Sequence, residues 1–393
     1  MSVLKQIVAV TMMNVKSIPR RVGSSCVVII GIAGVVGVIV SVFGMTRSLS
    51  QAVLDTGSPD RAIVLRGGAT SDVASTLLVD AVATIMDAPG IARTADGSVA
   101  ASAEMVAAVN LLRKEDGTRA GISVRGVGEQ GFAVRPEVEI VEGRAFRPGL
   151  REAIVGRAVH AEFRGMEIGD EIALRDSRWT VVGVFASGGD SLESSVLTDA
   201  DTLLSAYQRT AVNSVTVRLE SPAAFDEFKA ALTTNPTLSV TVDREADYYR
   251  RESEEATDIF ELVTTFVGGI MALGALFAAL NTMYSAVSAR TVEIATLRAL
   301  GFGSTGVVVS VLTESLLLAL IGALLGAAVS WALFNGNAVS LGGGVSSLVF
   351  QMRITPALLG QGVLWACALG LLGGLFPAVR AARLPVATAL RAV

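Results

Sequence analysis

The residues that most often do chemistry are sparse in this chain. Among 393 residues there is one histidine, His160, and there are two cysteines, Cys26 and Cys367. A zinc site needs three or four ligands, and His160 has no second histidine or cysteine near it in the sequence, so we expect no metal site. The carboxylates of the central region are scattered, as on a solvated surface, and we find no catalytic arrangement among them. The phosphate-binding pattern G-x-x-x-x-G-K-S/T is absent, so we expect any ATP to be bound by another polypeptide.

A short charged segment, residues 288–306, is the strongest candidate for a functional surface. Apolar and charged residues alternate in it at helical spacing: Val287, Thr291, Ile294, Leu297 and Leu300, with Arg290, Glu293 and Arg298 between them. Gly301 and Gly303 follow, as glycine does past a helix end. A tight turn between two helices needs only about 2–5 residues. The extra length predicts a docking helix for a partner, and the alternative is an interfacial helix that covers lipid headgroups.

Long apolar runs must position this segment. The chain is 51% hydrophobic with a mean hydropathy of +0.58, and a span needs about 20 apolar residues. Four runs are long enough, at residues 24–46, 260–287, 307–334 and 358–379. The first has an apolar core too long for a signal peptide, and no small-residue cleavage site follows it. We therefore expect four permanent transmembrane helices.

The charge distribution orients these spans. Residues 47–258 carry 22 Lys/Arg and 33 Asp/Glu, a net charge of −11, whereas the rest of the chain carries ten Lys/Arg and three Asp/Glu, a net charge of +7. Because positive flanks stay in the cytoplasm, we expect both termini and residues 288–306 inside. The acidic insert is then outside the membrane.

Two motifs resemble a known family. Asn281, the run Ser288-x-Arg290-Thr291-x-Glu293-Ile294 and the run Leu297-Arg298-Ala299-Leu300-Gly301 are similar to the signature of the FtsX/MacB/LolC family of ABC-transporter permeases. The C-terminal FPAVRAARLPVATALR, residues 376–391, resembles the closing motif of that family. Glu142-Gly143-Arg144 and the segments 152–156, 163–172 and 179–185 resemble its periplasmic core domain.

The resemblance implies a location, partners and cofactors. We expect a multi-pass protein of the bacterial inner membrane that works as a homodimer with a separate ABC ATPase subunit. ATP and Mg would be bound by that ATPase, and this chain would bind no cofactor. A periplasmic adaptor or membrane-fusion protein and membrane lipids are further expected partners, and nucleic acid is not.

The predicted fold is an α-helical membrane protein with an α+β domain between its first two spans. A cytoplasmic amphipathic lead-in (residues 1–23), a short external loop (335–357) and a cytoplasmic tail (380–393) flank the spans. Within residues 47–242, the pattern predicts strands and helices in two lobes, the second at about 212–242. The predicted elements are strands at 61–66, 121–127, 137–141, 171–174, 180–184, 214–219 and 239–242, and helices at 73–88 and 222–232. Residues 243–259 are rich in charge and lack Gly and Pro, which predicts a solvent-exposed helical stalk continuous with the second span.

Several residues inside the spans are candidates for helix packing or pairing. Small residues let transmembrane helices approach closely, so we expect packing faces, between helices or between two copies, at Gly31, Gly34, Gly37, Gly322 and Gly326. Asn281 would hydrogen-bond across helices. Glu314 needs a partner, and Arg290 or nearby backbone is expected to provide it; the alternative is a substrate or proton role. Cys26 and Cys367 are expected to be buried apolar residues without a disulfide.

The predicted function is that of a permease subunit that couples ATP hydrolysis on another subunit to a conformational change outside the membrane. Export or extraction of a lipid, lipoprotein, peptide or drug would fit. The alternative is a non-transporting, FtsX-like mechanotransmitter that regulates a cell-wall hydrolase. A membrane-anchored receptor without an ATPase is a third possibility.

Overall fold

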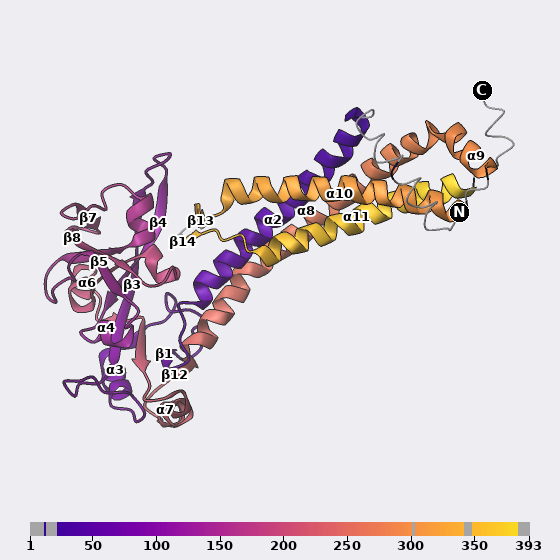
Figure 1. Cartoon of the computed structure of the whole chain (residues 1–393). Coiled ribbons are helices and arrows are strands. Elements are labelled where there is room, and N and C mark those ends of the chain that lie inside the picture. Colours follow the sequence, from indigo (N-terminus) through magenta and orange to yellow (C-terminus); the bar gives the residue numbers. More distant parts are fainter. Residues whose placement is uncertain (1–11, 13–21, 301–302, 342–347, 384–393) are drawn as a thin grey trace. The chain divides into compact units, whose positions relative to one another are not determined.

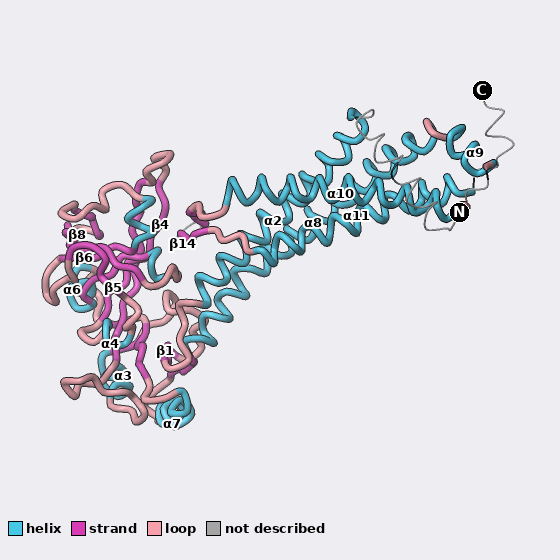
Figure 2. Tube along the Cα trace, in the orientation of Figure 1, coloured by secondary structure: helices cyan, strands magenta, loops and turns pink. Residues whose placement is uncertain are grey.

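The computed structural model describes residues 12, 22–300, 303–341 and 348–383. The chain divides into two units. The helical unit comprises residues 1–46, 259–337 and 352–393, and the α+β unit comprises residues 47–258 and 338–351. Most of the expected lead-in, residues 1–11 and 13–21, and most of the expected tail, residues 384–393, lie outside the described residues. Figure 1 traces the chain along its sequence, and Figure 2 separates its helices from its strands.

Four long helices and one short one make up the helical unit: α2 (Val22–Leu54), α8 (Glu245–Ser288), α9 (Thr291–Ala299), α10 (Ser304–Phe334) and α11 (Pro356–Arg383). Four of them are long and apolar enough to cross a membrane, at Ser25–Leu54, Thr265–Ser288, Ser304–Phe334 and Pro356–Arg383. The four predicted spans are confirmed. The last residues of α2, from Arg47, and the first residues of α8, up to Asp258, belong to the α+β unit.

Small residues set the packing of these helices, as expected for transmembrane segments. A Cβ atom on Gly373 of α11 would lie 2.9 Å from Cβ of Ala279 on α8, and one on Gly362 would lie 2.9 Å from Val40 of α2. Gly370 and Gly374 of α11 lie against α10 in the same way. Glycines of α11 that the sequence did not single out are therefore the ones that let α11 touch three other helices.

The α+β unit is built on one large mixed sheet (Figure 1). Its strands are β1 (Arg61–Arg66), β3 (Ala101–Leu112), β4 (Arg119–Val127), β5 (Glu139–Gly143), β6 (Glu152–Gly156), β7 (Glu171–Leu174), β8 (Ser177–Ala186), β9 (Ser195–Asp199), β11 (Ser214–Arg218) and β12 (Val240–Arg244). They follow the order β12-β1-β11-β3-β4-β9-β6-β8-β5, with β7 beside β8. Strands β2 (Leu77–Leu78) and β10 (Ala211–Val212) pair separately. The helices are α3 (Val79–Met86), α4 (Gly131–Val134), α5 (Arg157–Glu162), α6 (Ala200–Ala206) and α7 (Phe225–Thr233), with short 3₁₀ turns η2 (Ser191–Ser194) and η3 (Pro222–Ala224).

A small apolar cluster around Phe185 and two larger cores lie along this sheet. One surrounds the buried Trp179 and Phe163 and involves β4, β6, β8 and β9. The other surrounds Phe228 of α7 and involves β1, β11 and β12. Two lobes were expected, but the second is not made of residues 212–242 alone, because β1 lies between β11 and β12 and pairs antiparallel with both. A strand from the start of the domain thus completes the βαβ-like unit, a non-local pairing that local sequence patterns do not reveal.

Three local predictions need correction. Residues 73–88 were expected to be one helix, but α3 begins only at Val79 and is preceded by β2. The long strand β3, Ala101–Leu112, was not predicted, and its alanine-rich sequence lacks the usual β-branched pattern. The expected loop 335–357 contains the hairpin of β13 (Ala338–Leu341) and β14 (Leu348–Gln351). That hairpin belongs to the α+β unit, where Val349 joins the core and its N–H and C=O bond to Ser194 Oγ at 2.9 and 2.6 Å.

The stalk segment forms a helix, but it is not freely solvated. Residues 243–244 belong to β12, and α8 begins at Glu245. Glu245, Tyr248, Tyr249 and Ser253 lie on a buried face. The charged residues here form the ion pairs Arg250–Asp247 at 2.9 Å and Arg251–Asp243 at 2.6 Å.

Candidate functional site

The predicted docking segment folds as a distinct elbow in the helical unit. Helix α8 ends at Ser288, Arg290 precedes the nine-residue helix α9, and α10 begins at Ser304 after Gly303. Gly301 lies outside the described residues. The expected amphipathic helix is therefore present, although it is shorter than the sequence pattern suggested.

Arg290 is buried in the elbow rather than presented on its surface. Its two terminal nitrogens bond the two carboxylate oxygens of Glu314 on α10, at 3.0 and 3.1 Å. Each residue is only 5% exposed. A charge within a span costs a few kcal/mol unless it is paired, and this bidentate pair meets that requirement. The expected Arg290–Glu314 pair is thus found, whereas the expectation that Arg290 surrounds an outward-facing stripe is wrong.

The face of α9 that remains exposed differs from the expected apolar stripe. Ile294 and Val287 are buried, so that part of the stripe packs against the unit itself. The side chain of Leu297 lies outside the described residues, and Arg298 is half-buried and contacts a neighbouring group. Five of the described side chains are exposed here at helical spacing, and we call them the elbow surface: Val292, Glu293, Thr296, Ala299 and Leu300. Val292 and Leu300, at 41% and 73% exposure, make it apolar around one carboxylate.

The predicted glycine faces divide into two groups. Gly322 and Gly326 of α10 pack against α2; a Cβ on Gly322 would lie 2.8 Å from the carbonyl oxygen of Ile29, and one on Gly326 would collide with that of Ala33. Gly37 lies beside them, and its carbonyl accepts a 3.0 Å bond from Ser330 Oγ. In contrast, a Cβ atom on Gly31 or Gly34 would have no neighbour within 4 Å among the described residues. Gly322, Gly326 and Gly37 therefore pack helices within one chain, whereas Gly31 and Gly34 leave space on α2.

Two further predictions about the spans are corrected. Asn281 lies exposed on α8 instead of between helices of the same chain. Cys26 is exposed and Cys367 is half-buried, so the expectation of two buried cysteines is wrong; both are free thiols. His160 donates or accepts a 2.9 Å bond with Glu167, and the described residues contain no group of three metal-binding side chains.

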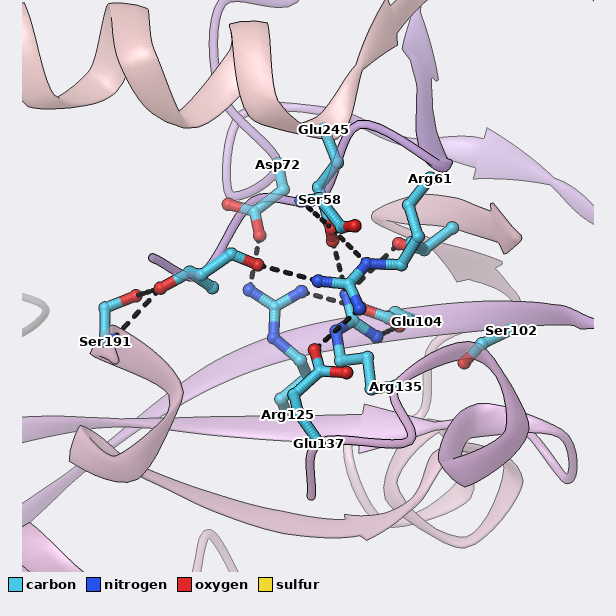
Figure 3. Close-up of polar contacts among 12 residues, drawn as sticks. Ser58, Arg61, Asp72, Ser102, Glu104, Arg125, Arg135, Glu137, Ser191 and Glu245 are labelled. Carbon is cyan, nitrogen blue, oxygen red and sulfur yellow. Dashed lines mark hydrogen bonds and ion pairs between the residues drawn. The ribbon is translucent and has the colours of Figure 1, made fainter. Parts of the chain in front are cut away.

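A buried charge network in the α+β unit was missed by the sequence reasoning (Figure 3). Glu104 of β3 and Glu245, the first residue of α8, are both fully buried. Arg135 bonds both carboxylates, the one of Glu245 at 3.2 Å. Arg61 of β1 also bonds Glu245, and Arg125 of β4 bonds Glu104 at 2.7 Å. The central carboxylates are thus not all scattered on a solvated surface.

The network extends beyond these five residues to the segments around it. Arg61 reaches Glu137 at 2.6 Å and the carbonyl oxygen of Thr56, which follows α2, at 2.9 Å. Arg125 reaches Asp72 at 2.7 Å. Residues from β1, β3, β4, the ends of α2 and α8 and two loops are thereby connected.

Electrostatics keep this network charged. Burial acts to raise the pKa of Glu104, but Arg135 and Arg125 outweigh it, so the pKa lies below its usual range. Burial acts to lower the pKa of Arg125 and of Arg135, but their carboxylate partners raise both pKa values above normal. Removing one member of such a buried cluster costs about 3–5 kcal/mol, because a charge is left without its partner.

The network fixes the first turns of α8 to the rest of the α+β unit. Glu245 accepts bonds from two arginines and from the N–H of Ser58 at 3.2 Å. Tyr248 accepts a 3.1 Å bond from the N–H of Asp72, and Ser253 bonds Ser50 of α2 at 2.8 Å. Helix α8 therefore starts from a rigid buried anchor and not from a flexible linker.

Comparison with known proteins places both units in one family. Residues 25–235 match the MacB-like periplasmic core domain, and residues 265–386 match the FtsX-like permease C-terminal domain. The chain belongs to the FtsX/MacB-like family of ABC-transporter permeases. As such it is a protein of the bacterial inner membrane, with four membrane helices and an α+β periplasmic domain between the first and second.

Individual relatives are similar over part of their length. The macrolide export ATP-binding/permease protein MacB of Escherichia coli is 24% identical over 324 residues, covering 78% of this chain and 49% of MacB. The protein with the same description from Hahella chejuensis is 28% identical, covering 68% of this chain and 43% of the relative. The chain therefore spans about half the length of these relatives.

Two solved structures are similar to this chain at lower identity. The periplasmic region of MacB from Actinobacillus actinomycetemcomitans is 16% identical with a TM-score of 0.38, covering 50% of this chain and 92% of that structure. The extracellular domain of the transporter YknZ from Gram-positive bacteria is 14% identical with a TM-score of 0.35, covering 47% and 99%.

Proposed function

We propose that this FtsX/MacB-like permease couples ATP hydrolysis on a separate ABC ATPase subunit to a conformational change of its periplasmic domain. One observation carries the proposal: α8 is a single helix from Glu245 to Ser288. It begins in the buried charge network and ends beside the elbow that the Arg290–Glu314 pair stabilises. A movement of the elbow would therefore be passed along one helix to the periplasmic network.

The elbow surface is the proposed contact with the ATPase. Amphipathic helices dock by placing apolar side chains in a partner's groove, and Val292 and Leu300 are exposed for this. Glu293 would set register and partner choice rather than most of the affinity. The buried Arg290–Glu314 pair would hold α9 in place without touching the partner.

An ATPase partner is part of the proposal because the chain belongs to a family of ABC-transporter permeases. The names of the relatives describe ATP-binding and permease functions in one protein. The sequence has no phosphate-binding loop motif. We propose that ATP and Mg are bound on another polypeptide, and that both termini of this chain lie in the cytoplasm with it.

A second copy of the chain completes the proposed assembly. Gly31 and Gly34 leave space on α2, and Asn281 is exposed on α8, at positions where small and polar residues favour contact between membrane helices.

The cargo would be a lipid, lipoprotein, peptide or drug, handed to a periplasmic adaptor or membrane-fusion protein. The observations do not favour the FtsX-like regulator, so recovery of a cell-wall hydrolase instead of an adaptor would count against transport.

The test is copurification of the tagged permease with its ABC ATPase, followed by ATP turnover in nanodiscs. Val292→Asp and Glu293→Lys should each reduce ATPase recovery or its stimulation at least tenfold, because the first places a charge in the apolar contact and the second reverses one. Glu227→Lys on the exposed surface of α7 is the matched charge-reversal control. Unchanged recovery and stimulation in both elbow variants, with unchanged thermal stability, would show that α9 is only an interfacial cover.

A further inference from the structure

A pocket of about 270 Å³ lies in the α+β unit, beside the buried charge network but outside the elbow. Its walls come from β3, β4 and η2, from Val53 at the end of α2, from Leu348 of β14 and from Tyr249 and Glu252 of α8. At roughly 30 Å³ per water molecule, the pocket has room for a ligand of about ten non-hydrogen atoms. Its size is near the lower end for small-molecule sites.

One part of the pocket is apolar, with side chains that suit a short hydrocarbon chain: Val53, Val73, Val106, Leu192 and Leu348. Other residues of the lining are polar or charged. Arg125 and Asp72 pair with each other there at 2.7 Å, so neither charge is available to a ligand without breaking that pair. Tyr249 is 7% exposed beside them.

Arg209 is the charged group that a ligand can reach. It lies exposed in the segment between α6 and β10, lines the pocket and forms no ion pair with any of the described residues. The other charged residues on the lining are the paired Arg125 and Asp72 and the carboxylate of Glu252, which already has an interaction. Arg209 is thus the one cation on the lining that is not already paired among the described residues, and it can balance one negative charge. A single carboxylate matches it, whereas the further charge of a phosphate would have no second unpaired cation beside it.

We propose that this pocket binds a monocarboxylate with a short apolar tail, with the carboxylate on Arg209 and the tail against the apolar wall. A medium-chain fatty acid and the C-terminal residues of an apolar peptide share this chemistry. Because the pocket contacts Tyr249 and Glu252 in the first turns of α8, a bound ligand stabilises the anchored form of this helix. Only this last consequence rests on the proposed function; binding itself does not.

The test is calorimetric titration of the full chain in nanodiscs, with heats from empty nanodiscs subtracted. The probes are octanoate against octanol, and the tripeptide Leu-Val-Leu as free acid against its C-terminal amide. We expect saturable binding of at least one acid and at least tenfold weaker binding of its uncharged counterpart. Binding of octanoate alone assigns a fatty acid, and binding of the tripeptide acid alone assigns a peptide C-terminus.

Three variants separate the pocket from general effects of charge. Arg209→Gln should weaken binding of the acid at least tenfold and leave octanol unchanged. Arg178→Gln removes the same charge from an 81% exposed side chain on β8 and should change nothing. Ala108→Phe places an aromatic ring from an exposed position of β3 into the pocket and should abolish binding.

The proposal is overturned if no acid binds saturably, if acid and uncharged probe bind equally, or if Arg209→Gln and Arg178→Gln have equal effects. ATP turnover of the same preparations separates this result from the proposed function. Failed binding with intact ATPase coupling refutes the pocket alone, whereas intact binding without any ATPase coupling refutes only the coupling role.

Discussion

Replacing Glu245 with glutamine tests the buried anchor of α8. The carboxylate is fully buried and accepts bonds from Arg61 Nε, from Arg135 Nη2 at 3.2 Å and from the N–H of Ser58 at 3.2 Å. Glutamine keeps the size of the side chain but removes the charge and offers one acceptor oxygen in place of two. Both arginines then lose a charged partner in a buried site.

The expected cost is about 3–5 kcal/mol, the usual penalty for removing one partner of a buried ion cluster. For a unit of this size, about 3 kcal/mol corresponds to a decrease of Tm by roughly 6–12 °C. Thermal unfolding of the full chain in nanodiscs, followed by tryptophan fluorescence, measures this decrease, since Trp179 is buried in the same unit.

Glu254→Gln is the matched control. It makes the same chemical change nine residues further along α8, at an exposed position, where surface substitutions usually change stability by less than about 0.5 kcal/mol. If Glu245→Gln lowers Tm no more than Glu254→Gln does, the network does not anchor α8 and the proposed transmission loses its periplasmic end.

Further predictions concern the elbow, pH dependence, topology and ATP turnover. Glu314→Leu should destabilise the helical unit by about 3 kcal/mol. Adding Arg290→Met should restore most of that stability in thermal unfolding, and a further, additive loss in the double variant would show that the two side chains do not stabilise each other. Burial raises the pKa of Asp190 to about 7, against hydrogen bonds that lower it. Between these pH values the folded form therefore holds a proton that the unfolded chain has lost, so the stability of the fold should fall as pH rises from about 4 to 7. Asp190→Asn should make this fall smaller, and a stability that rises over the same pH range would refute the raised pKa of Asp190. In a cysteine-free background, a cysteine at Ser71 but not one at Ser304 should react with an impermeant maleimide applied from the periplasm, and the reverse would invert the proposed topology. The purified chain alone should show no vanadate-sensitive ATP turnover once contaminating ATPases are excluded.

Sequence patterns predicted best what depends on local spacing and composition. The four spans follow from long apolar runs, and β1 and β7 follow from short β-rich runs; the predicted limits of both strands, 61–66 and 171–174, match the structure. The Arg290–Glu314 pair was also predictable, because a carboxylate inside a span requires a nearby cation.

Features that depend on distant pairing were not predictable in the same way. Glu104, Arg125 and Glu245 lie in three separate segments, and only the pairing of β3 with β4 and the start of α8 beside β1 bring them together. A signal was present, since Arg125 and Glu104 stand within strands where neighbouring residues are apolar and buried. From one sequence, however, a charged residue in a strand fits the solvent-facing side of a sheet as well as it fits a buried ion pair.

The orientation of α9 could not be read from periodicity either. Helical spacing identifies an apolar face, but it does not say whether that face contacts the same chain or a partner. Ile294 packs inward, and Val292, which the pattern did not include, is exposed. The pattern therefore did not say which of its residues are exposed: Leu300 of the predicted stripe is exposed, whereas Ile294 is buried.

The central claim is that ATP turnover on an ATPase bound to the elbow surface changes the periplasmic domain through α8. Hydrogen–deuterium exchange of the permease–ATPase complex in nanodiscs, with ATP, Mg and vanadate or without nucleotide, measures this directly. We predict a nucleotide-dependent change in exchange at residues 245–258 and at the strands that hold Arg61 and Arg125. In Glu245→Gln that change should be reduced while ATP turnover continues. Full ATP turnover of the unmodified complex with unchanged exchange throughout residues 47–258 would contradict the account.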